Sequence, residues 1–73
     1  MSHDRELSPK AQQVRVLLRG VRVFGSARAL LLWLETPCAA LGNSVPISLL
    51  ESREGIALVE AVLDMMEYGL VSL

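Results

Sequence analysis

The stretch WLETPCAALGNSVPISLLESREG, residues 33–55, decides the fold of this chain. It alternates apolar anchors with turn residues and helix starts, since proline suits the first turn of a helix and glycine the left-handed residue after the last turn. No anchor position carries a side chain that commonly acts in catalysis. Together with a preceding Phe-Gly pair, the anchors are Phe24, Gly25, Trp33, Leu34, Pro37, Leu41, Gly42, Pro46, Leu49, Leu50 and Gly55. Such an architectural pattern favours a protein that binds a partner over one that catalyses a reaction.

The chain has 73 residues, which corresponds to one small domain. Apolar residues make up 52% of it, and its mean hydropathy is +0.43. A chain this short buries only about 60% of the surface that its unfolded form exposes. We therefore expect an exposed apolar face that meets a partner protein or a second copy of the chain, as in a homodimer. A very well filled small core is the alternative.

The sequence predicts neither a membrane span nor a signal peptide. The longest uninterrupted apolar run, Ala29–Leu34, is far shorter than the ~20 residues that cross a bilayer. The charged start is not followed closely by an apolar stretch. One cysteine, Cys38, cannot form an internal disulfide, so a reducing cytoplasm is the expected location.

Serines that can cap helices divide the chain into helical segments. Ser8-Pro9 predicts a first helix that ends at Gly25. Ser26 predicts a second helix to about residue 36, and Pro46 starts a short third one. Ser52 predicts a closing helix over about residues 53–68, with Gly69 as its stop. The expected fold is all-α: a small bundle of about four helices, with two long helices flanking a turn-rich middle and one closing helix. Residues 1–8 are expected to be a flexible segment and residues 9–73 the folded domain.

Helical periodicity predicts which face of each helix is buried. The expected apolar face of the first helix is Val14, Leu17, Leu18, Val21 and Phe24. That of the second is Ala27, Leu30, Leu31 and Leu34, widened by Leu32 and Trp33. That of the closing helix is Ile56, Val59, Val62, Leu63 and Met66.

No set of residues suggests catalysis, a cofactor or a metal. His3 is the single histidine, and Cys38 has no second ligand at metal-binding spacing. Cys38 also lacks a neighbouring base, so a small buried side chain is its expected role. There is no glycine-rich phosphate loop. The sequence predicts a protein that is not an enzyme.

The charges are distributed unevenly. Residues 1–28 hold six basic and two acidic residues, and residues 29–73 hold one basic and six acidic residues. Arg15, Arg19 and Arg22 follow one helical spacing on the first helix, and Glu60, Asp64 and Glu67 repeat it on the last. These stripes are either two solvated faces, or two faces that meet within one chain or across a dimer. Binding of nucleic acid by the arginines is a third possibility, although three arginines without interleaved aromatic residues are a weak signal for it.

The ordered series Phe24-Gly25-Ser26, Trp33-Leu34, Pro37, Leu41-Gly42, Pro46, Leu49-Leu50, Gly55 and Gly69 resembles the toxin-binding domain of the Xre/MbcA/ParS family of bacterial antitoxins. The likeness covers about residues 14–70. Asn43 stands where the family usually has a second glycine, Tyr68 where it has histidine, and Cys38 where a polar residue is usual. Family members commonly carry a helix-turn-helix domain in front of this region.

The resemblance implies an antitoxin that binds a RES-domain toxin, an enzyme that consumes NAD or transfers ADP-ribose from it. In such pairs the C-terminal part of the antitoxin lies over the NAD pocket of the toxin. The residues expected to contact the toxin are Glu60, Asp64, Glu67, Tyr68, Gly69, Leu70 and Val71. Their acidic members would suit a basic pocket. The alternative function is a small helical DNA-binding or transcription-accessory protein that uses Arg15, Arg19 and Arg22.

Overall fold

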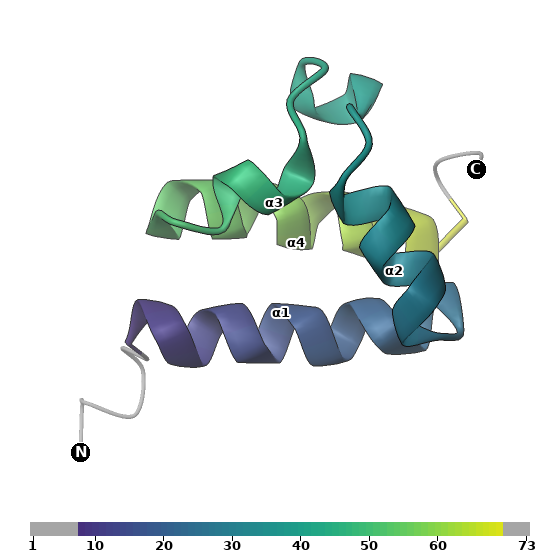
Figure 1. Ribbon diagram of the computed structural model, residues 1–73, viewed down its shortest axis with the longest axis horizontal. Helices are drawn as coiled ribbons and strands as arrows, with labels where there is room; N and C mark the ends of the chain where they lie inside the picture. Colours follow the sequence, from purple (N-terminus) through teal and green to yellow (C-terminus); the bar gives the residue numbers. More distant parts are fainter. Residues whose placement is uncertain (1–7, 70–73) are drawn as a thin grey trace.

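The computed structural model describes residues 8–69. Its elements, in chain order, are α1 (Pro9–Phe24), α2 (Ala27–Leu34), the 3-10 turn η2 (Ala39–Leu41), α3 (Pro46–Leu49) and α4 (Arg53–Glu67). The long helices α1 and α4 lie side by side, α2 and α3 pack across them, and the loop that contains η2 projects from the body (Figure 1). The predicted all-α bundle of four helices is confirmed. The long pair is α1 and α4, because α2 has only eight residues.

The three predicted serine caps are present. The hydroxyl oxygens of Ser8 and Ser26 each accept a hydrogen bond from the backbone N–H three residues on, at 3.1 Å. Ser52 accepts from Gly55 N at 2.9 Å. Each cap satisfies a backbone donor that has no partner within its own helix. Gly25, with φ of 88°, turns the chain so that α2 folds back over α1.

The core lies where α1, α2, α3 and α4 meet, and it contains Val16, Leu30, Leu34, Leu50, Ile56, Val59 and Leu63. The predicted face of α4 is confirmed: its members are buried except for half-buried Met66. In α2, Leu30 and Leu34 are buried, whereas Leu31 and Leu32 are exposed. The apolar surface of α2 is therefore only partly buried within one chain.

The predicted buried face of α1 is partly wrong. Val16 and Gly20 are the buried residues of this helix, and neither belongs to the predicted face. Leu17, Val21 and Phe24 pack against the edge of the core, but Val14 is 52% and Leu18 66% exposed. The reason is steric, because Gly20 lets the Leu30 side chain approach the α1 backbone closely. This contact turns α1 away from the face with the larger side chains.

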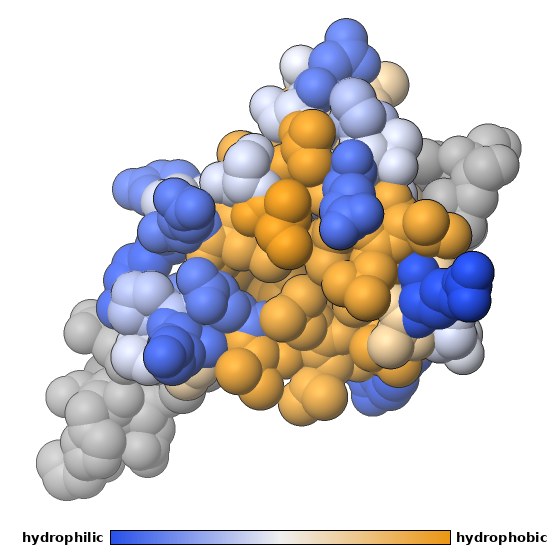
Figure 2. All heavy atoms as spheres, in the orientation of Figure 1, coloured by the Kyte–Doolittle hydropathy of each residue, from blue (hydrophilic) through white to orange (hydrophobic). Residues whose placement is uncertain are grey.

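Apolar side chains gather on the surface over α1, α2 and α3 (Figure 2). The large exposed apolar residues of the described chain are Val14, Leu18, Leu31, Leu32, Ile47, Leu58 and Tyr68. This agrees with the composition, which is more apolar than so small a core can absorb. Within residues 8–69, no helix is both long enough and apolar enough to cross a membrane.

Candidate functional site

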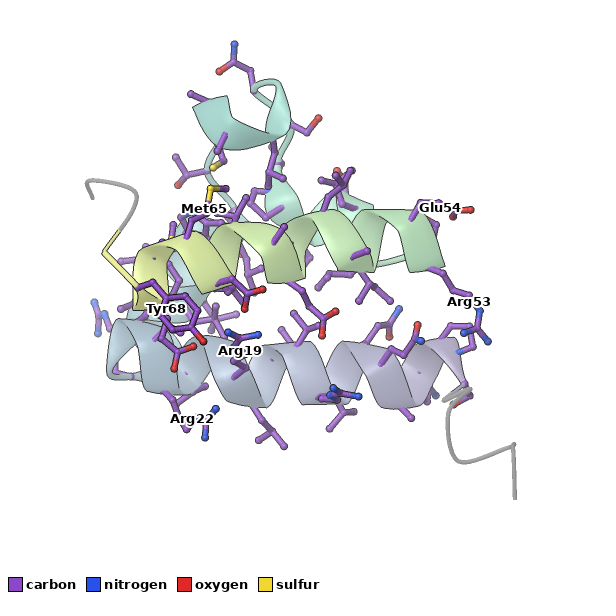
Figure 3. All side chains as sticks on the ribbon, turned by 180° about the vertical axis from the view of Figure 1, so that it is seen from behind. Arg19, Arg22, Arg53, Glu54, Met65 and Tyr68 are labelled. Atoms are coloured by element: carbon purple, nitrogen blue, oxygen red, sulfur yellow. The ribbon has the colours of Figure 1, made fainter. Side chains whose placement is uncertain are left out.

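The two charge stripes meet within one chain, at Arg19. The guanidinium of Arg19 donates to Glu67 Oε1 from Nη2 at 2.7 Å and from Nε at 3.3 Å, and Nη2 also forms an ion pair with Asp64 Oδ1. The Arg19 side chain is 25% exposed, less than either carboxylate. Arg19 therefore fastens the last turn of α4 to the middle of α1 (Figure 3).

The electrostatics of this cluster favour the charged guanidinium. The hydrogen bond to Glu67 is the main cause that raises the pKa of Arg19 above its ordinary value, with a further contribution from Asp64 and an opposing one from desolvation. Arg19 thus stays protonated throughout the range in which the protein can be studied. The two carboxylates have a permanent cation within their own chain.

An open groove of about 710 Å³ runs beside this cluster between α1 and α4. Its lining includes all three arginines of the α1 stripe. The residues that line it are Arg15, Leu18, Arg19, Val21, Arg22, Glu60, Glu67 and Tyr68. Tyr68, which is 73% exposed, follows the last turn of α4, and Arg22 projects from α1 (Figure 3). Arginine and tyrosine are residue types that are enriched in protein–protein interfaces.

The structure gathers part of the predicted contact set at one place. Glu60, Glu67 and Tyr68 line the groove, and Asp64 lies next to it through its ion pair with Arg19. Gly69 has φ of 74° and its N–H donates to Met66 O, so the chain turns away from α4 at this residue. Two predicted contact residues, Leu70 and Val71, lie outside the described residues.

Most of the residues predicted as anchors pack within the domain. The ring of Trp33 packs on that of Phe24 with centroids 5.3 Å apart. Among the other anchors, Leu34, Pro46, Leu50 and Gly55 are buried, and Leu41 and Leu49 are half-buried. The turn residues Gly25, Pro37 and Gly42 are exposed. Most of the 33–55 block therefore builds the domain and does not line the groove.

The projecting loop is closed by its own backbone. Cys38 N donates to Ser44 O at 3.0 Å, and Asn43 N donates to Cys38 O at 2.9 Å. Gly42 and Asn43 are both left-handed, with φ of 67° and 65°. The asparagine thus adopts the conformation expected of the glycine that it replaces.

Sequence reasoning missed one polar contact that orients the elements. Gln13 Nε2 donates to Leu50 O at 2.6 Å, which ties α1 to the end of α3. Glutamine at that position reads as an ordinary polar residue, and no local pattern marks a contact between residues 37 positions apart. In the described part of the chain there is no group of three or more side chains suited to hold a metal ion.

Comparison with known proteins agrees with this picture. The profile of the antitoxin Xre/MbcA/ParS C-terminal toxin-binding domain matches residues 19–69. A curated protein of Yersinia enterocolitica, "Antitoxin Xre", is 32% identical over 97% of this chain, which spans 52% of that protein. No solved structure gives a significant match. Since the matched profile covers most of the chain, this protein belongs to the Xre/MbcA/ParS family of antitoxin toxin-binding domains.

Proposed function

We propose that this chain is the antitoxin of a type II toxin–antitoxin pair and that it neutralises a RES-domain toxin by covering its NAD pocket. Family membership supports the binding of a toxin. The covering element would be the end of α4 with Tyr68, Gly69 and the residues that follow. The observation that supports this choice of covering element is the Tyr68 side chain, which is exposed and lines the α1–α4 groove. Coverage needs no chemistry from the antitoxin, so the chain would act without catalysis, in the cytoplasm where the toxin meets NAD.

The test is an assay of NAD consumption by the purified product of the adjacent gene. We expect this product to consume NAD, and an equimolar amount of the antitoxin to stop it. The inhibition should weaken as the NAD concentration rises, because antitoxin and NAD would compete for one pocket. Binding without inhibition would contradict coverage of the pocket, and absence of binding would contradict the whole proposal.

A single variant sharpens this test. Tyr68→Ala should weaken inhibition, since aromatic side chains at interface centres often carry much of the binding energy. Leu58→Ala is the matched control, because Leu58 is 53% exposed on α4 itself and does not line the groove. Equal effects of the two changes would argue against Tyr68 as a contact.

The apolar surface over α1, α2 and α3 supports a second proposal, that the antitoxin forms a homodimer (Figure 2). Covering such a surface removes apolar area from water. Light scattering during size-exclusion chromatography measures the mass directly. A monomer at every concentration, without the toxin, would rule out the homodimer.

The arrangement of charges does not favour the alternative of DNA binding. Arg19 is held by two carboxylates, and Glu60 and Glu67 line the same groove as Arg15 and Arg22. Carboxylates beside the arginines repel phosphates. If the protein did bind DNA, its affinity would fall steeply with salt, so a gel shift at low salt tests this alternative.

A further inference from the structure

The acidic and basic walls of the groove are not equivalent. On the α4 wall, the carboxylates of Asp64 and Glu67 are already paired with Arg19. On the α1 wall, Arg15 and Arg22 are exposed, and among residues 8–69 neither takes part in an ion pair. Outside the Arg19 cluster the charged residues that line the groove are Arg15, Arg22 and Glu60, so two of the three are basic. A basic partner would compete with Arg19 for Asp64 and Glu67.

The same wall of α1 carries apolar surface. Leu18 lies three residues after Arg15 and four before Arg22, so the three side chains share one side of the helix. Leu18 is 66% exposed, and Tyr68 adds an exposed ring from the end of α4. Arginine and tyrosine are among the residue types enriched at the energetic centres of interfaces. An apolar strip with a cation at each end suits a ligand that has an apolar ridge with a carboxylate at each end.

We propose that the α1–α4 groove binds an amphipathic, acidic helix of the toxin. The apolar ridge of that helix would pack on Leu18 and Tyr68, and its carboxylates would pair with Arg15 and Arg22. This is the groove-binding mode in which residues three or four apart act as anchors. The proposal rests on the proposed function for the identity of the partner. It assigns the electrostatic part of recognition to the arginines of α1, whereas the sequence pointed to the acids of α4.

Charge complementarity selects this occupant over a nucleic acid. Glu60 and Glu67 in the groove would face the phosphates of a nucleic acid. A protein helix can place carboxylates opposite the arginines and neutral side chains opposite Glu60. Protein–protein complexes of this type are steered by charge, so their association rates depend on salt.

The experiment compares two double variants with the same change in charge. The first variant, Arg15→Glu with Arg22→Glu, reverses the charge of two residues that line the groove. The control, Lys10→Glu with Arg28→Glu, reverses the charge of two exposed residues that do not line it. Circular dichroism first checks that both variants are folded, which we expect because all four substituted side chains are exposed. Calorimetry then measures affinity for the intact toxin at two salt concentrations.

We expect the groove variant to lose affinity by about tenfold or more, mainly at low salt. The control should change by less than about threefold, because charges outside the contact act only through a screened field. A Lys scan of the toxin's acidic residues should then find a position that restores binding to the groove variant.

The outcomes separate the two proposals. If the toxin binds the native antitoxin and both double variants alike, the groove proposal is wrong and the proposed function stands. If the toxin does not bind the native protein, the proposed function is wrong and the groove proposal falls with it. Loss of DNA binding or of self-association in the groove variant, with toxin affinity unchanged, would assign the groove to a nucleic acid or to a second copy.

Discussion

Gly55 lies directly against the backbone carbonyl of Leu49. A Cβ atom placed on Gly55 would be 1.9 Å from Leu49 O and 2.7 Å from Leu49 C. Backbone atoms of α3 cannot rotate away as the end of a side chain can. The start of α4 can therefore pack on α3 only if residue 55 has no side chain.

Gly55→Ala should destabilise the protein by about 3 kcal/mol or more, at the upper end of the range for overpacked cores. Chemical denaturation followed by circular dichroism measures the change. A loss below about 1 kcal/mol, the usual size of a point-mutation effect, would show that α3 can shift away from α4 at little cost.

Gly20→Ala should cost less, although position 20 is also buried. Its Cβ would lie 2.6 Å from Leu30 Cδ1 and 3.0 Å from Leu30 Cδ2. The clash involves the far end of a side chain, and alanine in place of glycine stabilises a helix interior by about 1 kcal/mol. We expect a net loss of about 1 kcal/mol, since repacking around Leu30 costs somewhat more than the helix gains. A larger loss than for Gly55→Ala would reverse our ranking of the two contacts.

Truncation of Leu34 should destabilise the protein far more than truncation of Leu18. Leu34 is 1% exposed in the core, so Leu34→Ala should cost about 2–5 kcal/mol. Leu18 is 66% exposed, so Leu18→Ala should change stability by about 0.5 kcal/mol or less. Thermal unfolding of the isolated protein compares the two. Similar losses would mean that α1 buries the face predicted from periodicity and not the face with Val16 and Gly20.

Asn43 should tolerate glycine but not valine. Its φ of 65° is left-handed, which costs a residue with a β-carbon roughly 1–2 kcal/mol and suits asparagine better than most. Asn43→Gly should be close to neutral. Asn43→Val should lose about 1–2 kcal/mol, because β-branched residues strongly avoid this region. Equal denaturation midpoints for the two variants would argue against a left-handed residue 43.

Replacement of Arg15, Arg19 and Arg22 together by Gln should leave the protein folded at room temperature. Any loss of stability should come from Arg19→Gln alone, because Arg19 is the member that contacts α4. The raised pKa of Arg19 means that its contribution is complete below the ordinary arginine pKa and is lost only as pH rises through the higher folded value. Thermal midpoints of the single and triple variants should therefore agree across neutral pH and differ less from the native protein at high salt. Unfolding of the triple variant would contradict this view.

Local signals in the sequence predicted much of this structure. Ser8, Ser26 and Ser52 act through hydrogen bonds to residues three positions away, so the neighbouring sequence suffices to identify them. The same holds for the turn at Gly25. The buried face of α4 was predictable because Ile56, Val59, Val62, Leu63 and Met66 recur at helical spacing along one side of the helix.

The buried face of α1 was not predictable in this way. Apolar residues occupy more than one side of α1, so periodicity allows several orientations of the helix. The choice among them depends on Leu30, which lies on another helix and packs into the space above Gly20. The candidate groove has the same origin, because its walls come from residues about 45 positions apart in the chain.

By itself the sequence determined the helices, their caps, the turns between them and the family to which the chain belongs, since each depends on short-range backbone chemistry or on an ordered motif. Only the tertiary structure decided which apolar residues of α1 remain exposed and which arginine of the stripe pairs with Asp64 and Glu67. These outcomes depend on how closely two helices approach, and that distance is set by contacts between residues remote in the chain.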